Sequence, residues 1–574
     1  MSVTRPLLVL ALALTLAAPP LRAAEADPDA GAYLAARSAV MAGDYRDAVG
    51  WFTRALIADP TNPALLDGAL VGQISLGEFD AAYALADQVK RLGQRSQSSA
   101  VALTAHEIAT GQFEGYLTAL KEGRSVNPAV DALTAAWAEL GAGRMSEALA
   151  GFDKIAATDG LQPFGLYHKA LALASVGDFE GADEILSGGL QVMRQGQIAH
   201  AQILSQLERN DEAIALLEKT FGTDQDPMID GLIARLKAGE TLPFDVARNA
   251  TDGVAEVYFT VATAMNGEAT DATTLIYSRV ASYLRPDHLD AILLTGALLQ
   301  QQEQFAVAME AYGAVPQDHP SYYAAVIGRA ESMAAMGQTD EAIALLTELS
   351  KTHGDLMIVH LSLGDMLRRE ERFAEAAAAY DRAIDVLGTP DQRHWVLFYS
   401  RGIANEREKQ YEKSDADFRR ALELNPDQPQ VLNYLGYSMV ERNINLDEAL
   451  GMIQRAVALQ PDSGYIIDSL AWALFMMGRY EEALEPMEKA SVLEPVDPIV
   501  TDHLGDVYWA VGRKREAEFQ WHRALSFDPE EDQAIRIRRK LEVGLDAVLA
   551  EEGATPLAQR LAVAEQAGAT PQGN

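Results

Sequence analysis

Residues 498–529 read PIVTDHLGDVYWAVGRKREAEFQWHRALSFDP. Gly505 in the first half and Ala517 in the second half carry little or no side chain, so two short antiparallel helices can pack closely there. The large side chain of Trp521 fills the flank of this contact, and Pro529 ends the second helix because it lacks a backbone N–H. The stretch therefore predicts a helical hairpin.

The hairpin recurs at a fixed interval. Prolines 34 residues apart stand at Pro461, Pro495 and Pro529. The same interval separates Ala449, Ala483 and Ala517. This interval, with the order Leu-Gly, Tyr, Ala, aromatic, Ala and Pro, resembles the tetratricopeptide repeat. The resemblance implies an all-α, right-handed superhelical solenoid of helical hairpins, about 12 to 14 repeats long, in which each hairpin covers the apolar face of its neighbour.

The small residue that opens each second helix allows the repeats to be counted. It is found at Ala48, Ala82, Gly115, Ala148, Ala182, Ala213, Thr274, Ala308, Ala342, Ala376, Ser414, Ala449, Ala483 and Ala517. One step, from Ala213 to Thr274, covers 61 residues, which is close to two periods. We expect one degenerate repeat, or a bend between two arrays, in this interval.

These features divide the chain into six expected parts. They are a signal peptide (1–26), an N-terminal array (27–221), a degenerate repeat or bend (222–256), a C-terminal array (257–530), a capping helix (531–552) and a flexible tail (553–574). The capping helix carries a basic cluster, Arg536, Arg538, Arg539 and Lys540. We interpret this cluster as a solvated face rather than as a docking patch, because a terminal repeat needs a polar outer surface.

Charge and the N-terminus bear on partners and location. With 83 acidic and 47 basic residues, the chain is unsuited to nucleic acid or anionic lipid. Arg5, the apolar run 7–18 and a small-x-small site ending at Ala26 favour a cleaved signal peptide and a periplasmic destination, with an uncleaved anchor as the alternative. The chain has no cysteine, so no lipid-anchoring cysteine follows the signal.

An acidic and aromatic surface is predicted on the first helices of the last three hairpins. At about 100° per residue, one arc of these helices faces away from the hairpin core, and the tetratricopeptide resemblance implies that this arc lines the concave groove through which partners bind. The candidate partner-binding residues on it are Asn433, Tyr437, Tyr465, Asp468, Trp472, Phe475, Asp502, Asp506 and Trp509. Carboxylates and ring faces suit a basic or aromatic-bearing peptide. In the alternative interpretation, Trp472 and Phe475 pack on the next hairpin.

Signals for catalysis are sparse, and no cofactor is expected. Asp502, His503 and Asp506 lie within about one helical turn and are the best candidates for a metal site or an acid/base pair. Acidic residues are abundant in this chain, and no third anchoring ligand is evident. We therefore favour the interpretation that the three residues stand together by chance and form neither a metal site nor a catalytic pair. We therefore expect a non-enzymatic scaffold, with a hydrolase or metal-dependent enzyme as the alternative.

A narrower resemblance concerns residues 433–513. The string NYLGYSM, LDEAL, YIIDSLAWAL, GRYEEAL and DHLGDVYWAVGR looks like the C-terminal part of proteobacterial envelope repeat proteins. Some of these are outer-membrane lipoproteins that act as adaptors for carboxy-terminal processing proteases. The resemblance implies an adaptor that binds envelope proteins, and a carboxy-terminal processing protease is one partner that it suggests. The missing cysteine argues against a lipid anchor. An assembly or secretion factor for the outer membrane or cell wall is a further alternative.

Overall fold

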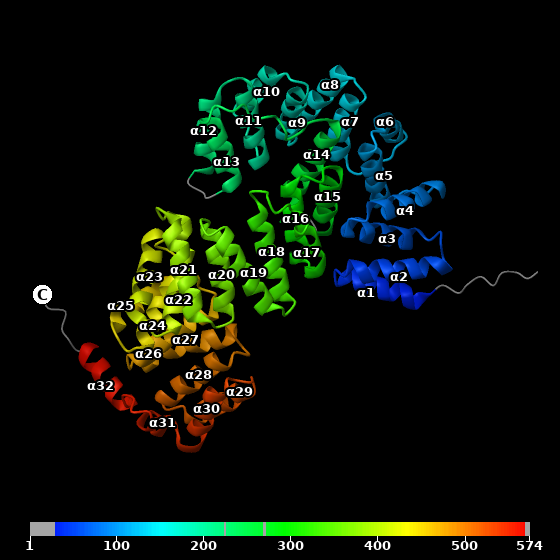
Figure 1. The fold of residues 1–574 in the computed structure, drawn as a ribbon. Coiled ribbons are helices and arrows are strands. Elements are labelled where there is room, and N and C mark those ends of the chain that lie inside the picture. Colours follow the sequence, from blue (N-terminus) through cyan, green and yellow to red (C-terminus); the bar gives the residue numbers. More distant parts are fainter. Residues whose placement is uncertain (1–28, 223–225, 268–270, 569–574) are drawn as a thin grey trace, which may run out of the picture. The chain divides into compact units, whose positions relative to one another are not determined.

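The structure is a computed structural model that describes residues 29–222, 226–267 and 271–568. Every regular element in these residues is a helix (Figure 1). The chain forms two compact units, Met1–Ala342 and Ile343–Asn574, and the division falls inside α19 (Thr339–Thr352). The expected signal peptide, residues 1–26, lies outside the described residues.

The first unit contains eighteen helices before α19 among the described residues. They are α1 (Ala30–Met41), α2 (Tyr45–Ala58), α3 (Pro63–Leu76), α4 (Phe79–Arg91), α5 (Gln97–Ala109), α6 (Phe113–Lys121), α7 (Pro128–Gly141), α8 (Met145–Ala156), α9 (Gln162–Ser175), α10 (Phe179–Leu186), α11 (Arg194–Gln206), α12 (Asn210–Phe221), α13 (Pro227–Lys237), α14 (Ala250–Met265), α15 (Asp271–Leu284), α16 (Leu289–Gln301), α17 (Phe305–Tyr312) and α18 (Tyr322–Ala335).

The second unit continues the same alternation. After α19 it contains α20 (Met357–Arg369), α21 (Phe373–Leu387), the short 3-10 helix η1 (Gln392–His394), α22 (Trp395–Arg407), α23 (Tyr411–Leu424), α24 (Pro429–Glu441), α25 (Leu446–Leu459), α26 (Gly464–Met476), α27 (Tyr480–Leu493), α28 (Pro498–Ala510), α29 (Lys514–Leu525), α30 (Glu531–Val543), α31 (Leu545–Glu551) and α32 (Leu557–Gly568).

Consecutive helices pair into hairpins within each unit, which confirms the all-α repeat fold. The hairpin α28–α29 shows the reason. Ala517 is completely buried, and a Cβ added at Gly505 would lie 2.4 Å from the Nε1 atom of Trp521. The two helices therefore approach closely only because these positions are small, as the sequence predicts.

One of the fourteen small positions is wrong. Gly115 in α6 is exposed, and a Cβ there would meet no atom closer than 3.9 Å. Tyr116 is the buried residue, in the register that Ala82 occupies in α4, three residues after the first phenylalanine of each helix. This hairpin therefore packs around a tyrosine ring instead of a small side chain.

Within the first unit the chain turns back along its own N-terminal hairpins (Figure 1). Helix α14 packs against α5, α7 and α9, and α15 packs against α3 and α5. Residues on all sides of α14 are buried, as expected for a helix surrounded by others. A Cβ added at Gly253 would lie 2.2 Å from the indole ring of Trp137, so α14 meets α7 in direct contact.

Buried polar groups join these returning helices to the N-terminal hairpins. The His168 Nδ1 atom accepts a hydrogen bond from the Trp137 indole at 3.2 Å, and its Nε2 atom lies 3.3 Å from Thr260 Oγ1. Tyr167 donates to Glu256 Oε1 at 2.8 Å, and His288 Nε2 lies 3.1 Å from the other oxygen. Because buried polar groups need partners, these contacts fix the position of α14.

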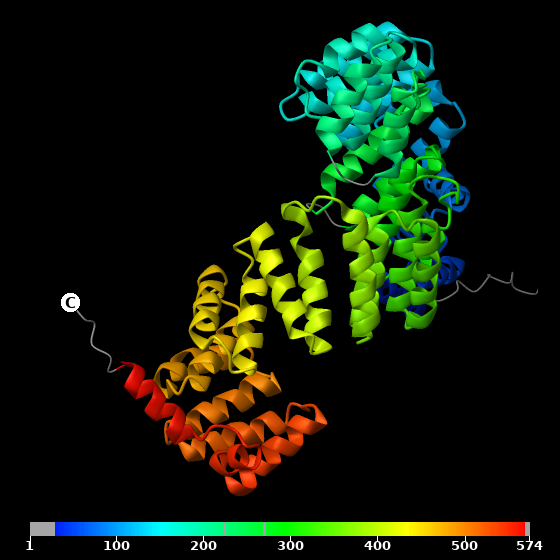
Figure 2. The ribbon, with the colours of Figure 1, turned by 60° about the vertical axis from the view of Figure 1, so that its left-hand side comes forward.

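The C-terminal segment differs from the single capping helix that the sequence suggests. Its first helix ends at Val543, because Gly544 adopts a φ of 84°, and α31 then begins at Leu545. Part of the expected flexible tail forms a further helix, α32. All three helices follow the last hairpin of the second unit (Figures 1 and 2).

Candidate partner-binding face

The predicted residues lie on α24, α26 and α28, and the structure divides them into a closed part and an open part. Asp468, Trp472, Phe475, Asp502, Asp506 and Trp509 form what we call the closed face. Asn433 and Tyr437 on α24 remain half-exposed. Tyr465 joins neither group, because its side chain is 57% exposed and lies beside Glu494 and Asp497.

Two rings of the closed face are internal. Phe475 is buried, and Trp472 is 9% exposed. The two rings stack at 4.8 Å between centroids, and the Trp472 indole also stacks on His503 at 3.9 Å. The Trp472 Nε1 atom donates to Glu441 Oε1 at 2.9 Å. Both aromatics therefore pack between hairpins, which is the alternative interpretation of the sequence.

Asp468 holds His503 across the contact between α26 and α28. The His503 Nδ1 atom lies 2.9 and 3.1 Å from the two Asp468 oxygens. Burial alone would lower the pKa of His503, but the negative charges of Asp468, Asp502 and Asp506 raise it above its usual value. The protonated imidazole is thus favoured, and it is bound by a carboxylate of its own chain.

Lys540 on α30 occupies the remaining carboxylates. Its ammonium Nζ atom lies 2.6 and 2.8 Å from the Asp506 oxygens and 2.9 and 2.8 Å from those of Asp502. The Lys540 side chain has no exposed surface, and Asp506 also accepts a hydrogen bond from the Trp521 indole at 2.9 Å. The expectation that the whole basic cluster is a solvated face is therefore wrong for Lys540.

The other C-terminal helices complete the cover. Trp509 donates through Nε1 to Asp546 Oδ2 at 2.9 Å, and the Arg560 guanidinium lies 5.8 Å from the centre of the Phe475 ring. The Tyr480 hydroxyl donates to the Leu557 carbonyl at 2.9 Å. Helices α30 to α32 thus cover the closed face. They place cations next to its carboxylates and rings, which is the chemistry that the sequence suggests for a partner protein.

Sequence reasoning missed the residues that close this face. Lys540 lies 34 residues after Asp506, which is one repeat period, so α30 takes the place of the next repeat's first helix. The signal was present in the opposite charges of the basic cluster and of the acidic pair. Because terminal helices commonly present their charges to water, opposite charges alone do not reveal this pairing.

The alternative catalytic interpretation can be examined at Asp502, His503 and Asp506. The first and last of these bind Lys540, and His503 is turned toward Asp468. Burial raises the pKa of Asp502, and the neighbouring Lys540 opposes that rise. In the part of the chain that the structure describes, no group of three His, Cys, Asp or Glu side chains is arranged to hold a metal ion.

An open face lies upstream on α22 and α24. Its half-exposed rings are Trp395, Tyr399, Tyr434 and Tyr437. Trp395 and Tyr399 are 5.9 Å apart between centroids, and Tyr399 meets Tyr434 edge-on at 6.0 Å. Glu406 and Glu441 lie next to these rings and close to each other, and burial raises the pKa of Glu406. We call these six residues, with Asn433, the open face.

Comparison with known families identifies the repeat. Models described as tetratricopeptide repeat match residues 298–356, 328–390 and 397–428. These segments contain hairpins of the same kind as the rest of the array. Residues 298–390 and 397–428 are thus identified as tetratricopeptide repeats, as the spacing of the small residues predicts.

Individual relatives are similar over limited lengths. A TPR repeat-containing protein of Pseudomonas aeruginosa is 25% identical over 185 residues, which is 32% of this chain and 30% of that protein. The human protein O-mannosyl-transferase TMTC1 is 26% identical over 177 residues, or 31% of this chain and 20% of the transferase. This chain thus spans less than a third of the length of these relatives, and the activity in the second name is that of the human protein.

Solved structures include similar helical repeats. The Cut9 and Hcn1 hetero-tetramer of the APC/C gives a TM-score of 0.39 at 15% identity, covering 90% of this chain and 96% of that one. YrrB, described as a TPR protein with an unusual peptide-binding site, gives 0.27 at 19% identity and covers 34% of this chain and 97% of its own. Within the described ranges of our structure, every helix is too short or too polar to span a bilayer.

Proposed function

We propose that this protein is a non-enzymatic scaffold that binds a protein partner through the open face of its second unit. The observation that carries the proposal is the half-exposed aromatic cluster on α22 and α24 beside two carboxylates. Aromatic side chains supply much of the binding energy in protein interfaces. The neighbouring closed face is already bound by α30 to α32, so the open face is the better candidate within the predicted surface.

The chemistry of the open face favours a partner segment with basic and aromatic residues. Glu406 and Glu441 can pair with Lys or Arg, and tyrosine faces attract cations. Tyr437 is half-buried, and this burial, with the negative charges of Glu441 and Asp468, raises its pKa. Its hydroxyl therefore stays protonated and bonds Glu441, and its oxygen can accept a hydrogen bond from a bound peptide.

We further propose that this scaffold acts in the cell envelope. The support is the signal-like N-terminus and the resemblance of residues 433–513 to envelope adaptors. In this proposal the scaffold links an envelope protease, or an assembly machine, to its substrates.

Quantitative affinity capture from an envelope fraction tests the open face. Tyr437→Ala and Tyr399→Ala should each weaken retention of the same partner by about tenfold or more, because truncating an interface aromatic commonly costs about 1.4 kcal/mol or more. Phe519→Ala is the matched control, since this ring on α29 is 74% exposed and lies away from the open face. Equal capture by the tyrosine variants and by the control would contradict the proposal.

A further inference from the structure

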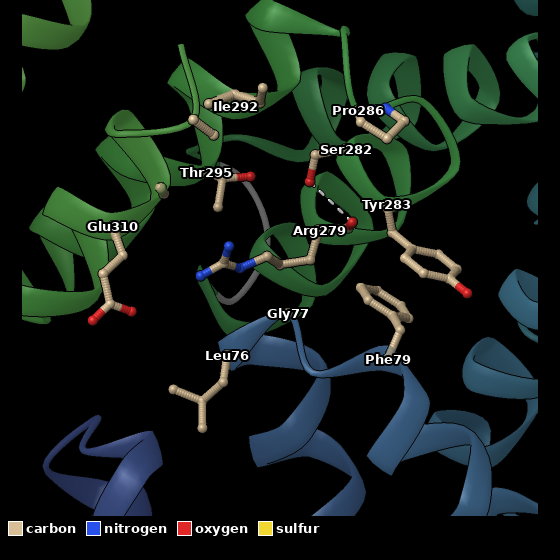
Figure 3. Close-up of a pocket in the computed structure, with 12 residues that line it drawn as sticks. Leu76, Gly77, Phe79, Arg279, Ser282, Tyr283, Pro286, Ile292, Thr295 and Glu310 are labelled. Atoms are coloured by element: carbon tan, nitrogen blue, oxygen red, sulfur yellow. Dashed lines mark hydrogen bonds between the residues drawn. The ribbon is translucent and has the colours of Figure 1, made fainter. Parts of the chain in front are cut away.

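A pocket in the first unit contains an arginine, Arg279, whose terminal nitrogens meet no partner among the residues that the structure describes. The pocket has a volume of about 270 Å³ and lies between the turn joining α3 to α4 and the helices α15, α16 and α17 (Figure 3). Arg279 on α15 extends into it, and its Nε atom donates to the Ser75 carbonyl at 2.8 Å. Within the described residues, no ion pair or hydrogen bond involves its two Nη nitrogens.

The nearest lining carboxylate is bound elsewhere. Glu310 lines the same pocket, but both of its carboxylate oxygens lie 2.6 Å from Arg46 Nη2. In Figure 3 the Arg279 guanidinium points toward the side where Glu310 lies and away from the rings of Phe79 and Tyr283. Burial lowers the pKa of Arg279 to about 10, so the group is still a cation at neutral pH.

A structural role explains only part of this arginine. The Nε–H group of Arg279 satisfies a backbone carbonyl in the last turn of α3. This bond needs only one of the guanidinium's donors. A guanidinium has five donors in a planar fork that matches a carboxylate. A half-buried cation with unused donors and an open pocket beside it is the arrangement that an anionic ligand completes.

The remaining walls define the rest of the ligand. Leu76, Ile292, Ala311 and Ala314 supply aliphatic surface. At about 30 Å³ for each water molecule, the volume holds roughly nine waters, or a group about as large as one amino-acid residue. This is large enough for a carboxylate with a short aliphatic group.

We propose that the Arg279 pocket binds a carboxylate attached to an aliphatic group of about leucine size. The carboxylate pairs with the Nη nitrogens of Arg279, and the aliphatic group contacts the apolar walls. The site belongs to the first unit and is independent of the open face. The same chemistry is offered by the C-terminal residue of a partner protein and by a free small acid.

Calorimetric titration of the full chain with N-acetyl-leucine, and with its amide, tests the site. We expect a Kd of about millimolar for the acid, as is typical of so small a ligand, and no binding of the amide. Arg279→Gln should weaken binding by about tenfold or more, because the charge-assisted bonds are lost. Glu310→Gln should tighten binding by about threefold, because it removes the competing carboxylate.

The controls separate the pocket from the chain's overall charge and fold. Arg91→Gln removes an exposed arginine of the same unit and should leave the Kd unchanged. Glu310→Gln changes an exposed side chain and is expected to bind the acid more tightly, so it remains informative even if Arg279→Gln fails to fold.

Tighter binding of Ala-Ala-Ala-Leu than of N-acetyl-leucine would assign the site to a protein C-terminus, and equal binding would assign it to a free acid. The proposal would be overturned if the acid did not bind, if the amide bound equally well, or if a folded Arg279→Gln protein showed an unchanged Kd for the acid.

Discussion

Lys540 and Asp506 form a fully buried ion pair, with the Nζ atom 2.6 Å from Oδ1. Replacing Lys540 by Met would leave Asp506 and Asp502 without their cation, and breaking a buried pair in this way commonly costs about 3 to 5 kcal/mol. We expect this loss of folding free energy to fall on the last hairpin and on α30. Hydrogen exchange of α28 and α30 in the full chain measures it.

Two further variants make this prediction specific. Lys489→Met removes an exposed lysine of α27 and should change stability by less than about 0.5 kcal/mol. Asp506→Lys should unfold the last hairpin, because it places two ammonium groups in one buried site. Normal protection of α28 in either Lys540→Met or Asp506→Lys would show that the ion pair does not hold α30.

The raised pKa of His503 gives the last hairpins a pH dependence. Its folded-state pKa lies above the unfolded value of about 6.5, so its contribution to stability is complete below that value and is lost as pH rises through the folded pKa. The raised pKa of Asp502 acts in the same direction but at lower pH. We expect unfolding of the second unit to become easier from pH 6 to pH 9. His503→Gln should remove most of that slope, and an unchanged slope would exclude His503 as the cause.

The first unit should respond to acid instead. Burial lowers the pKa of His168 to about 3, so the folded state keeps this imidazole neutral. Its contribution to stability is present above the unfolded pKa and is lost as pH falls toward the folded value. Between pH 7 and pH 4.5 the loss should be about 3 kcal/mol. Hydrogen exchange of α9 and α14 checks this, with His168→Gln as the variant whose acid sensitivity should be smaller.

The contact between Gly253 and Trp137 predicts the behaviour of α14. Gly253→Ala should cost about 1 to 3 kcal/mol or more, because the added methyl group overlaps the indole ring. Gly451→Ala is the matched control, since a Cβ at this helical position meets nothing within 4 Å. That substitution should be neutral or stabilising by up to about 1 kcal/mol. Similar thermal stability of the two variants would contradict the packing of α14 on α7.

The repeat fold could be predicted from the sequence because each hairpin repeats one local rule. A small residue on the first helix faces an aromatic ring on the second at a fixed position, and Gly505 with Trp521 shows the rule directly. It failed at Gly115, where the glycine stands one position before the buried Tyr116. Spacing alone does not identify which of two neighbouring residues points inward.

The return of α14 and the cover by α30 could not be predicted by the same rule. Both depend on contacts between distant segments, such as Tyr167 with Glu256, whereas a repeat pattern describes only nearest neighbours. For the candidate site, the exposure of the predicted residues depends on a C-terminal segment that carries the complementary charges.

Lysine reactivity tests the closed face most directly. Brief labelling of the native chain with an amine-specific acylating reagent, followed by peptide mass spectrometry, compares Lys540 with the exposed Lys514 of α29. Because the Lys540 side chain has no exposed surface, it should react at least about a hundredfold more slowly than Lys514, which corresponds to an opening free energy of roughly 2.8 kcal/mol. Equal labelling of Lys540 and Lys514 in the native chain would show that α30 does not close this face.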